Sequence, residues 1–290
     1  MTDAEDTAEA WADRGLYVPD EEGMADGALS STLMRGLAVL GCFTVTDGSL
    51  SNSEIARRIN LGRPTVSRLC KTLVHLGYLR KDDRGAFRLA PGLLALTHPV
   101  LAATPWRHRV AGPMREIADM YDGNVALAVL SEDRFVHIQT AGDPLNFPHV
   151  PEMGITGPLH RSAGGRALLS LLSSQALYDK LAELRARHPE EFARHAAHTR
   201  ASIERCWREG FCVSYGEWHH NIFVASAPLG RSEDGLLVAL TCALPRYRTR
   251  AEMVEADLGP RLAGLADSLR MTGLFHAPEI GRPLSSQTAE

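Results

Sequence analysis

Apolar residues recur every three or four positions in three segments near the start of the chain, at residues 30–43, 54–59 and 63–76. This spacing predicts three amphipathic helices. Ser51 and Glu54 have the spacing of a capping box, which marks the start of the second helix. Because only a tight break separates the second helix from the third, these two helices are expected to form a helix-turn-helix.

The predicted third helix has the side chains of a recognition helix. Arginines and short hydroxyl side chains gather near its N-terminus, the end that enters the major groove. Two short strands around the polar turn at residues 82–85 then predict a β-hairpin, the wing, with Arg84 at its tip. A cation at this tip can reach backbone phosphate or the minor groove. The residues expected to contact DNA are Ser53, Arg63, Thr65, Val66, Ser67, Arg68, Lys71, Arg80, Lys81 and Arg84.

Beyond residue 107 helical patterns alternate with hairpin patterns. The apolar positions of residues 110–120 predict a helix, and two β-hairpins are expected, residues 125–130 with 135–140 and residues 223–229 with 236–244. Further helices are predicted at residues 163–172, 175–187, 199–209 and 250–270. Helices and hairpins in this order indicate a second domain of the α+β class.

Charge is distributed unevenly along the 290 residues, although the net charge is only −4. Residues 1–28 contain nine acidic residues and one arginine, whereas residues 29–90 contain ten basic residues and four acidic ones. The remainder of the chain is close to neutral. One compact basic module is therefore expected to bind nucleic acid.

Length and composition exclude several classes of protein. The chain is long enough for two domains. Its longest apolar stretch, at residues 93–103, is interrupted by His98 and Pro99 and is too short for a membrane span, and no secretory signal precedes it. A cytoplasmic protein without a membrane segment is therefore expected. The five cysteines have no CxxC spacing and are interpreted as free thiols, and no cofactor or metal is expected.

Several ordered motifs resemble the IclR family of transcription regulators. The resemblance runs from about residue 30 to about residue 271 and carries three N-terminal motifs, SNSEIA at 51–56, TVSRL at 65–69 and LGYL at 76–79. It continues with GPLHRSAGGRA at 157–167, REGF at 208–211 and ASAP at 225–228. The chain departs from the family at Gly62 and Pro64, which shift the expected start of the recognition helix by a residue or two. Pro99 and Pro105 interrupt the stretch that forms a continuous linker helix in this family, so a bent linker is expected.

The resemblance implies a winged helix-turn-helix, a linker helix and a GAF-like effector-binding domain. The expected organisation is a disordered acidic tail at residues 1–28, a DNA-binding domain at 29–90, a linker at 91–106, the effector-binding domain at 107–274 and a flexible tail at 275–290. The implied partners are a double-stranded DNA operator and a small-molecule effector, with a homodimer or homotetramer as the assembly.

The small residues at 162–165, just before a predicted helix, have two interpretations. Accessible backbone amides beside Arg161 and Arg166 would hold a carboxylate, whereas close packing of helix against sheet would equally require small side chains. The resemblance favours the effector pocket. The loop that contains Glu217 and His219 is expected near its mouth, with an exposed loop as the alternative. The expected effector-binding residues are Ser162, Ala163, Gly164, Ser214, Glu217, His219, Val224, Thr241 and Ala243.

An enzyme is the competing class of function. Cys206 or Cys212 would serve as nucleophile with His219 or His220 as base, or these four residues would bind a metal ion. No orienting acid and no known ligand spacing accompanies them, so no catalytic residue is expected. A DNA-architectural protein without effector control would leave nearly two-thirds of the chain without a role. The sequence therefore favours a regulator whose affinity for its operator is controlled by a small molecule, a carboxylate.

Overall fold

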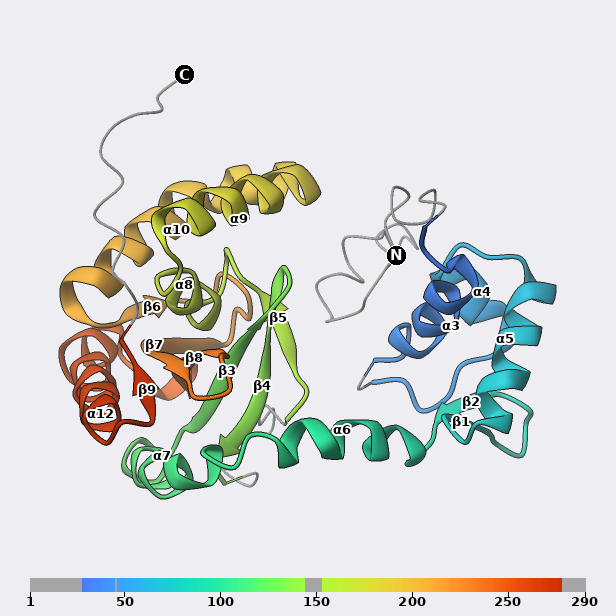
Figure 1. Cartoon of the computed structure of the whole chain (residues 1–290), viewed down its shortest axis with the longest axis horizontal. Coiled ribbons are helices and arrows are strands. Elements are labelled where there is room, and N and C mark those ends of the chain that lie inside the picture. Colours follow the sequence, from blue (N-terminus) through green and yellow to red (C-terminus); the bar gives the residue numbers. More distant parts are fainter. Residues whose placement is uncertain (1–27, 45, 144–152, 278–290) are drawn as a thin grey trace. The chain divides into compact units, whose positions relative to one another are not determined.

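The computed structural model describes residues 28–44, 46–143 and 153–277, and the chain divides into two compact units, Met1–Ala103 and Thr104–Glu290 (Figure 1). Almost all of the predicted acidic tail, residues 1–27, and residues 278–290 of the predicted C-terminal tail lie outside the described residues.

The N-terminal unit contains the three predicted helices and the wing. Its elements are α3 Ser31–Gly41, α4 Asn52–Arg58, α5 Arg63–His75, β1 Leu79–Lys81, β2 Phe87–Leu89 and α6 Gly92–Ala102. The predicted capping box is confirmed: the Ser51 N–H donates to Glu54 Oε2 at 2.6 Å, and the Glu54 N–H donates to Ser51 Oγ at 3.2 Å. These two bonds fix the start of α4, because each gives a backbone N–H group at the helix terminus a hydrogen-bond acceptor.

One apolar core holds the helix-turn-helix and the wing together. Val66, Cys70 and Leu73 on one side of α5 are buried in it, and Leu79 and Phe87 of the wing strands pack into the same cluster. The opposite side of α5 is consequently left at the surface. The core therefore sets which side chains of α5 are available to a partner.

Two prolines, Pro99 and Pro105, were expected to interrupt the linker helix, and the helix α6 differs from this expectation at the first of them. It continues through Pro99 and ends at Ala102, and the next helix begins at Arg107, after Pro105. The prediction of an interruption is therefore wrong at Pro99, while the helical stretch does end before Pro105. Because no residue of α6 is buried, solvent can reach a carbonyl group that the proline leaves without its N–H partner.

The C-terminal unit is an antiparallel sheet with helices on both faces, which confirms the α+β class. Its elements are α7 Arg107–Tyr121, β3 Asn124–Ser131, β4 Arg134–Ala141, β5 Thr156–Pro158, α8 Ala163–Leu169, α9 Ser174–Arg187, α10 Pro189–Glu209, β6 Cys212–Ser214, β7 Ile222–Ser232, β8 Leu237–Pro245, η1 Arg246–Arg248, α11 Ala251–Met253, the π-helical turn η2 Val254–Leu258, α12 Gly259–Met271 and β9 Phe275–His276. The strand order is β5-β4-β3-β8-β7-β6, and β9 pairs with β7.

The helices cover the two faces of this sheet differently. Figure 1 shows α8 between the sheet and the pair α9 and α10. The helices α7 and α12 pack against β3, β4, β7 and β8, and the Tyr121 hydroxyl of α7 donates to Asp257 of η2 at 2.7 Å. On β8, Thr241 lies against α8, whereas the side chains of its neighbours in sequence point to the other face.

Both predicted hairpins are confirmed, and the differences lie in short or terminal elements. The strands β5, β6 and β9 were not predicted, and α10 begins ten residues before the predicted residue 199. The predicted flexible tail is wrong at its start: Phe275 is buried, its ring centroid lies 5.2 Å from that of Trp106, and β9 pairs with Arg231 and Ser232 of β7. Aromatic packing and strand pairing thus hold this segment to the unit.

Candidate DNA-binding surface and effector site

The helix α5 carries three of the six cations that the sequence assigned to DNA. Arg63, Arg68 and Lys71 are exposed, and the hydroxyl residues Thr65 and Ser67 are half-buried between them. Pro64 occupies the first turn of the helix, where the missing N–H of proline costs no helical hydrogen bond. The helix thus presents cations and short hydroxyl groups on the surface that the core leaves open.

Val66 is a correction to the predicted DNA contacts. Its side chain is fully buried in the core of the N-terminal unit, so it cannot contact a base edge. The helical period places Val66 on the apolar side of α5 with Cys70 and Leu73, so the sequence itself already predicts that Val66 is buried.

The wing presents further cations, and Ser53 is exposed on α4. Arg80, Lys81 and Arg84 are exposed, and Lys81 lies over the ring of Phe87 at 5.5 Å from its centroid. The wing turn is held by Asp82 Oδ1, which accepts hydrogen bonds from the backbone N–H groups of residues 84 and 86 at 3.0 and 2.9 Å. A fixed turn keeps Arg84 at the tip of the hairpin.

Arg88 is a cation that the sequence reasoning did not assign to DNA. It stands directly opposite Arg80 in the register of β1 and β2, and like charges in this position repel each other. Its partner Asp82 is 3.9 Å away, a long separation for an ion pair. The period-two pattern of the hairpin, which places residues 80 and 88 on the same face, could have identified it.

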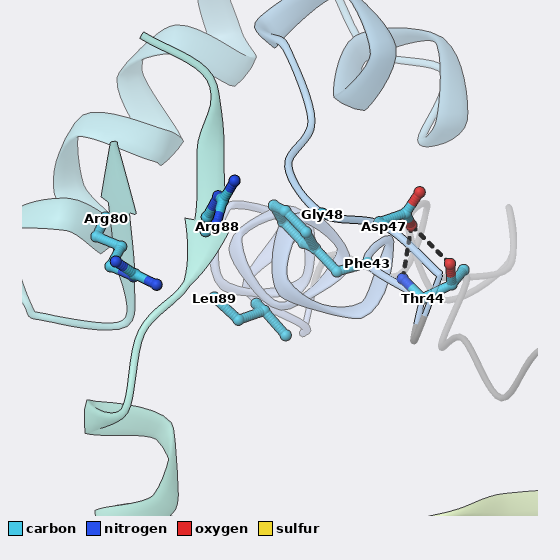
Figure 2. Close-up of a pocket in the computed structure, with 7 residues that line it drawn as sticks. All are labelled: Phe43, Thr44, Asp47, Gly48, Arg80, Arg88 and Leu89. Atoms are coloured by element: carbon cyan, nitrogen blue, oxygen red, sulfur yellow. Dashed lines mark hydrogen bonds between the residues drawn. The ribbon is translucent and has the colours of Figure 1, made fainter. Parts of the chain in front are cut away.

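A pocket of about 220 Å³ lies beside this arginine pair (Figure 2). One side is formed by the loop after α3, where Asp47 accepts hydrogen bonds from the Thr44 N–H at 2.7 Å and the Thr44 hydroxyl at 2.8 Å. Asp47 also forms an ion pair with Arg58 at 2.5 Å. Burial alone would raise the pKa of Asp47, but the bonds from Arg58 and Thr44 outweigh it and lower the pKa to about 2. The carboxylate is thus committed to the loop, and the exposed charge of the pocket is positive.

In the C-terminal unit, the sheet brings several of the predicted effector residues together. Ser214, Val224 and Ala243 are register partners across β6, β7 and β8, and the same row continues to Asn124 of β3. Thr241 occupies the next row on the same face. These residues therefore form one continuous patch, which lies on the face that α8 covers.

The packing interpretation of the small residues at 162–165 is supported at two positions. A Cβ on Gly164 would lie 3.0 Å from Thr241 Cγ2, and a Cβ on Gly165 would lie 2.4 Å from the backbone of Leu159. Ser162 is the N-cap of α8: its hydroxyl accepts a hydrogen bond from the Gly165 N–H at 3.1 Å and donates one to the Pro158 carbonyl at 2.6 Å. Close approach of α8 to its neighbours thus requires the glycines, independently of any ligand.

Glu217 is the most extensively bonded of the predicted effector residues. Its carboxylate accepts hydrogen bonds from the Ser214 hydroxyl and, at 2.7 Å, from the Tyr215 N–H. It also lies 2.9 Å from His198 Nε2 and 3.6 Å from the guanidinium of Arg166. Burial alone would raise the pKa of Glu217, but these partners outweigh it and lower the pKa to about 2. The side chain is therefore a carboxylate at neutral pH.

The loop that carries Glu217 continues into an aromatic contact. Trp218 is half-buried, and its ring meets that of Phe135 edge to face at 5.4 Å between centroids. His219 is exposed, and its ring lies tilted against that of Trp218 with 4.1 Å between the centroids. The structure thus supports the packed-tryptophan interpretation of this loop, and a ligand contact by His219 remains a prediction.

Buried polar groups without partners lie on the same face of the sheet, and the sequence reasoning missed them. The amide of Asn124, the hydroxyl of Ser226 and Nδ1 of His137 are buried and form no hydrogen bond. Burial lowers the pKa of His137 to about 4, which makes its ring neutral at pH 7. Such groups are costly unless something bonds to them, so they are candidate ligand contacts. The long apolar runs around them in the sequence gave no signal of this arrangement.

The residues of the competing enzyme hypothesis are not assembled into a reactive site. Cys206 is buried, and burial raises the pKa of its thiol well above the usual value, which opposes formation of a thiolate. Cys212 is also buried, and its thiol donates to the Ala163 carbonyl at 3.4 Å, whereas His219 and His220 are exposed. Within the described parts of the chain, no group of three or more His, Cys, Asp or Glu side chains is suited to hold a metal ion.

Within residues 28–44, 46–143 and 153–277, no helix combines the length and the apolar character needed to cross a membrane.

Two family signatures match the chain in the order of its two units. Residues 32–83 match the IclR helix-turn-helix domain, and residues 98–270 match the C-terminal domain described as "Bacterial transcriptional regulator IclR C-terminal". The second match alone covers more than half of the chain.

Similar proteins include transcriptional regulators that match this chain over most of its length. The Pca regulon regulatory protein of Pseudomonas putida is 27% identical over 253 residues, covering 83% of this chain and 84% of that protein. The crystal structure of an IclR family transcriptional regulator from Brucella abortus has 32% identity and a TM-score of 0.72, covering 90% of this chain and 98% of that one. An IclR homologue from Microbacterium hydrocarbonoxydans, solved in complex with 4-hydroxybenzoate, has 22% identity and a TM-score of 0.60, covering 83% of this chain and 99% of that one.

Proposed function

This chain belongs to the IclR family of transcriptional regulators, and we propose that it binds an operator through α5 and the wing with an affinity set by a small carboxylate in the C-terminal unit. The exposed cations of α5 are the single observation that carries the DNA-binding part. Arg63, Arg68 and Lys71 are exposed on a helix whose apolar positions are buried in the core, and a major groove admits an α-helix.

The wing supplies the contacts to the phosphate backbone. Arg80 and Arg84 lie outside the core, and the repulsion between Arg80 and Arg88 is relieved when a phosphate group lies between them or beside the pocket of Figure 2. Contacts of this kind add affinity without sequence information, whereas the α5 contacts read bases. We therefore assign sequence selectivity to α5 and salt-dependent affinity to the wing.

Effector binding is assigned to the sheet face beneath α8. Ser214, Val224 and Ala243 form one row there, and the unbonded polar groups of Asn124 and Ser226 lie on the same face. The homologue from Microbacterium hydrocarbonoxydans, which shares the fold, binds 4-hydroxybenzoate, and we propose a carboxylate of this general kind as the effector class. A second proposal, catalysis by the C-terminal unit, has no observation in its favour because both candidate thiols are buried.

We propose a homodimer or homotetramer as the functional assembly. Leu33 and Leu37 of α3 are 63% and 51% exposed, and Leu94 and Val100 of α6 are 69% and 60% exposed. Exposed apolar side chains on a helix without any buried residue are typical of an interface, and a second copy of this chain presents the same helices for a symmetric contact. Two copies would place two recognition helices in successive major grooves of a pseudo-palindromic operator. The site of action is the cytoplasm, where bacterial DNA lies.

The effector acts by shifting a population between two arrangements of the assembly. A ligand that binds both arrangements with equal affinity would shift nothing, so it must bind the operator-competent and operator-incompetent states differently. Selection of bound fragments from fragmented genomic DNA, followed by a screen of carboxylates for release or recruitment of the selected duplex, tests both parts of the proposal. Recovery of one enriched sequence whose binding responds to a carboxylate is the expected result. A random fragment population would contradict the DNA-binding part, and an enriched sequence that no carboxylate affects would contradict the effector class.

A further inference from the structure

The carboxylate of Glu217 is held by a set of donors that resembles a site for a free carboxylate. Its partners come from three rigid elements, Arg166 of α8, His198 of α10 and Ser214 of β6, together with the Tyr215 N–H. Charge-assisted hydrogen bonds from several fixed donors are how proteins bind carboxylates in general.

Arg166 is the least accessible member of this set. Its side chain is fully buried, its Nε donates to the His160 carbonyl at 3.1 Å, and its second terminal nitrogen has no hydrogen-bond partner. A buried guanidinium requires a counter-charge, and Glu217, whose carboxylate lies 3.6 Å away, is the acid that the described structure places beside it. This nitrogen leaves the guanidinium with a donor for a further or different anion.

Glu217 itself is not part of a rigid element. It lies in the loop between β6 and β7, one residue after Gly216, whose φ of +103° is accessible mainly to glycine. Ser214, at the end of β6, is also one of the residues in the sheet row of the proposed effector site. The carboxylate of this loop residue and the proposed ligand therefore share a donor.

We propose that Glu217 is a built-in competitor for the effector: in the ligand-free protein its carboxylate occupies the donors that the carboxylate of the effector takes over. This inference rests on the proposed function, since it concerns the same effector site. A carboxylate tethered by a short loop acts at an effective concentration on the order of millimolar or more. Simple carboxylates are therefore poor competitors, and a ligand that also contacts the sheet face displaces Glu217.

Displacement of Glu217 has a consequence for its neighbour. Trp218 follows directly in the chain and packs on Phe135 of β4, so movement of the Glu217 backbone pulls the indole ring away from that contact. The loop thus links occupation of the donors to a change at the sheet, and the fluorescence of Trp218 reports it.

The test compares wild-type protein with E217Q, using sodium benzoate and sodium 4-hydroxybenzoate as probes in isothermal titration calorimetry. The neutral amide removes the competing charge but keeps the size of the side chain. Binding of at least one probe is expected to become about tenfold tighter, the equivalent of one charge-assisted contact. The matched control is E209Q, which removes a carboxylate that pairs with Arg205 and Arg208, and its affinities are expected to equal those of the wild type. An E217Q protein that binds no probe more tightly than the wild type overturns the proposal.

Two further variants keep the test decisive. E217D withdraws the carboxylate by one methylene group and is expected to show a smaller gain, and it replaces E217Q if the latter does not fold. Adding S214A to E217Q removes a shared donor and is expected to reduce the gain.

Fluorescence gives an independent readout. A probe that binds the wild-type protein should change the tryptophan emission of the protein, and the change should be absent in W218F. Binding without a change from Trp218 also overturns the proposal. Failure of the proposed function is a separate result, because it appears as absent operator binding by wild-type protein.

Discussion

The two units use their charged side chains in opposite ways. In the N-terminal unit, Arg63, Arg68 and Lys71 project from α5 with no ion pair among the described residues. In the C-terminal unit, Arg166 is fully buried beside Glu217, and Arg161 pairs with Glu191 at 2.6 Å. Exposed cations are available to a polyanion, whereas buried charges stabilise a fold only when they are paired. The cations of α5 are therefore available to a partner, whereas Arg166 and Arg161 contribute to the packing of the second unit.

Loss of an arginine from α5 should have the strongest effect on DNA binding. Arg63→Ala and Arg68→Ala should each weaken operator binding by about 1–3 kcal/mol and relax selectivity, because each removes a candidate base contact. Titration of the operator with each variant, followed by fluorescence anisotropy, measures the loss. Circular dichroism should show an unchanged fold. Unchanged operator affinity in both variants would contradict the assignment of α5 as the recognition helix.

A substitution in the C-terminal unit should destabilise it without touching a charge. Gly165→Ala places a Cβ 2.4 Å from the backbone of Leu159, which cannot move freely, so the unit should lose about 1–3 kcal/mol of stability. Urea unfolding measures this loss. Gly264→Ala on α12 is the matched control, since no atom lies within 4 Å of the added carbon. Equal stability of the two variants would show that α8 does not depend on the close approach at Gly165.

Acid should remove the contribution of the half-buried ion pair between Glu191 and Arg161. Burial alone would raise the pKa of Glu191, but its contacts with His160 and Arg161 outweigh this and lower the pKa from 4.5 to about 2. Because the pKa is depressed in the folded state, the stabilisation is present above pH 4.5 and is lost as the pH falls toward 2. Glu191→Gln should therefore cost about 1–3 kcal/mol at pH 7 and nearly nothing near pH 2.

Urea unfolding of the Glu191→Gln variant and the wild type across this pH range gives the measurement. Glu209→Gln serves as control, because its partners Arg205 and Arg208 lie nearer the surface and an exposed pair contributes little. If the difference in unfolding free energy between the wild type and Glu191→Gln stays constant with pH, the charge of Glu191 does not stabilise the fold.

The smallest expected effect concerns the wing. Arg84→Ala should weaken binding to operator and unrelated duplex alike and reduce the slope of log K against log salt concentration by about one, because it removes a phosphate contact. Arg88→Ala tests the cation that faces Arg80, with the same expectation. Binding measured over a range of salt concentrations checks both. A slope that neither substitution alters would exclude the wing from the interface.

Local patterns in the sequence predicted the N-terminal unit well, whereas contacts between residues distant in the sequence could not be predicted. The capping box at Ser51 and Glu54 and the turn of the wing depend on neighbouring residues, which the sequence shows directly. Val66 was assigned to DNA although its period placed it in the core. The donors around Glu217 come from α8, α10 and β6, and no local spacing predicts such a convergence. The two-residue strand β9 is similarly too short to give a pattern.

The decisive measurement is the salt-dependent binding of the purified protein to its operator and to an unrelated duplex of equal length. We expect tight, sequence-selective binding whose affinity falls steeply with salt, because the exposed cations of α5 and the wing displace counterions from the phosphates. Weak binding of equal strength to both duplexes, with little dependence on salt, would contradict it.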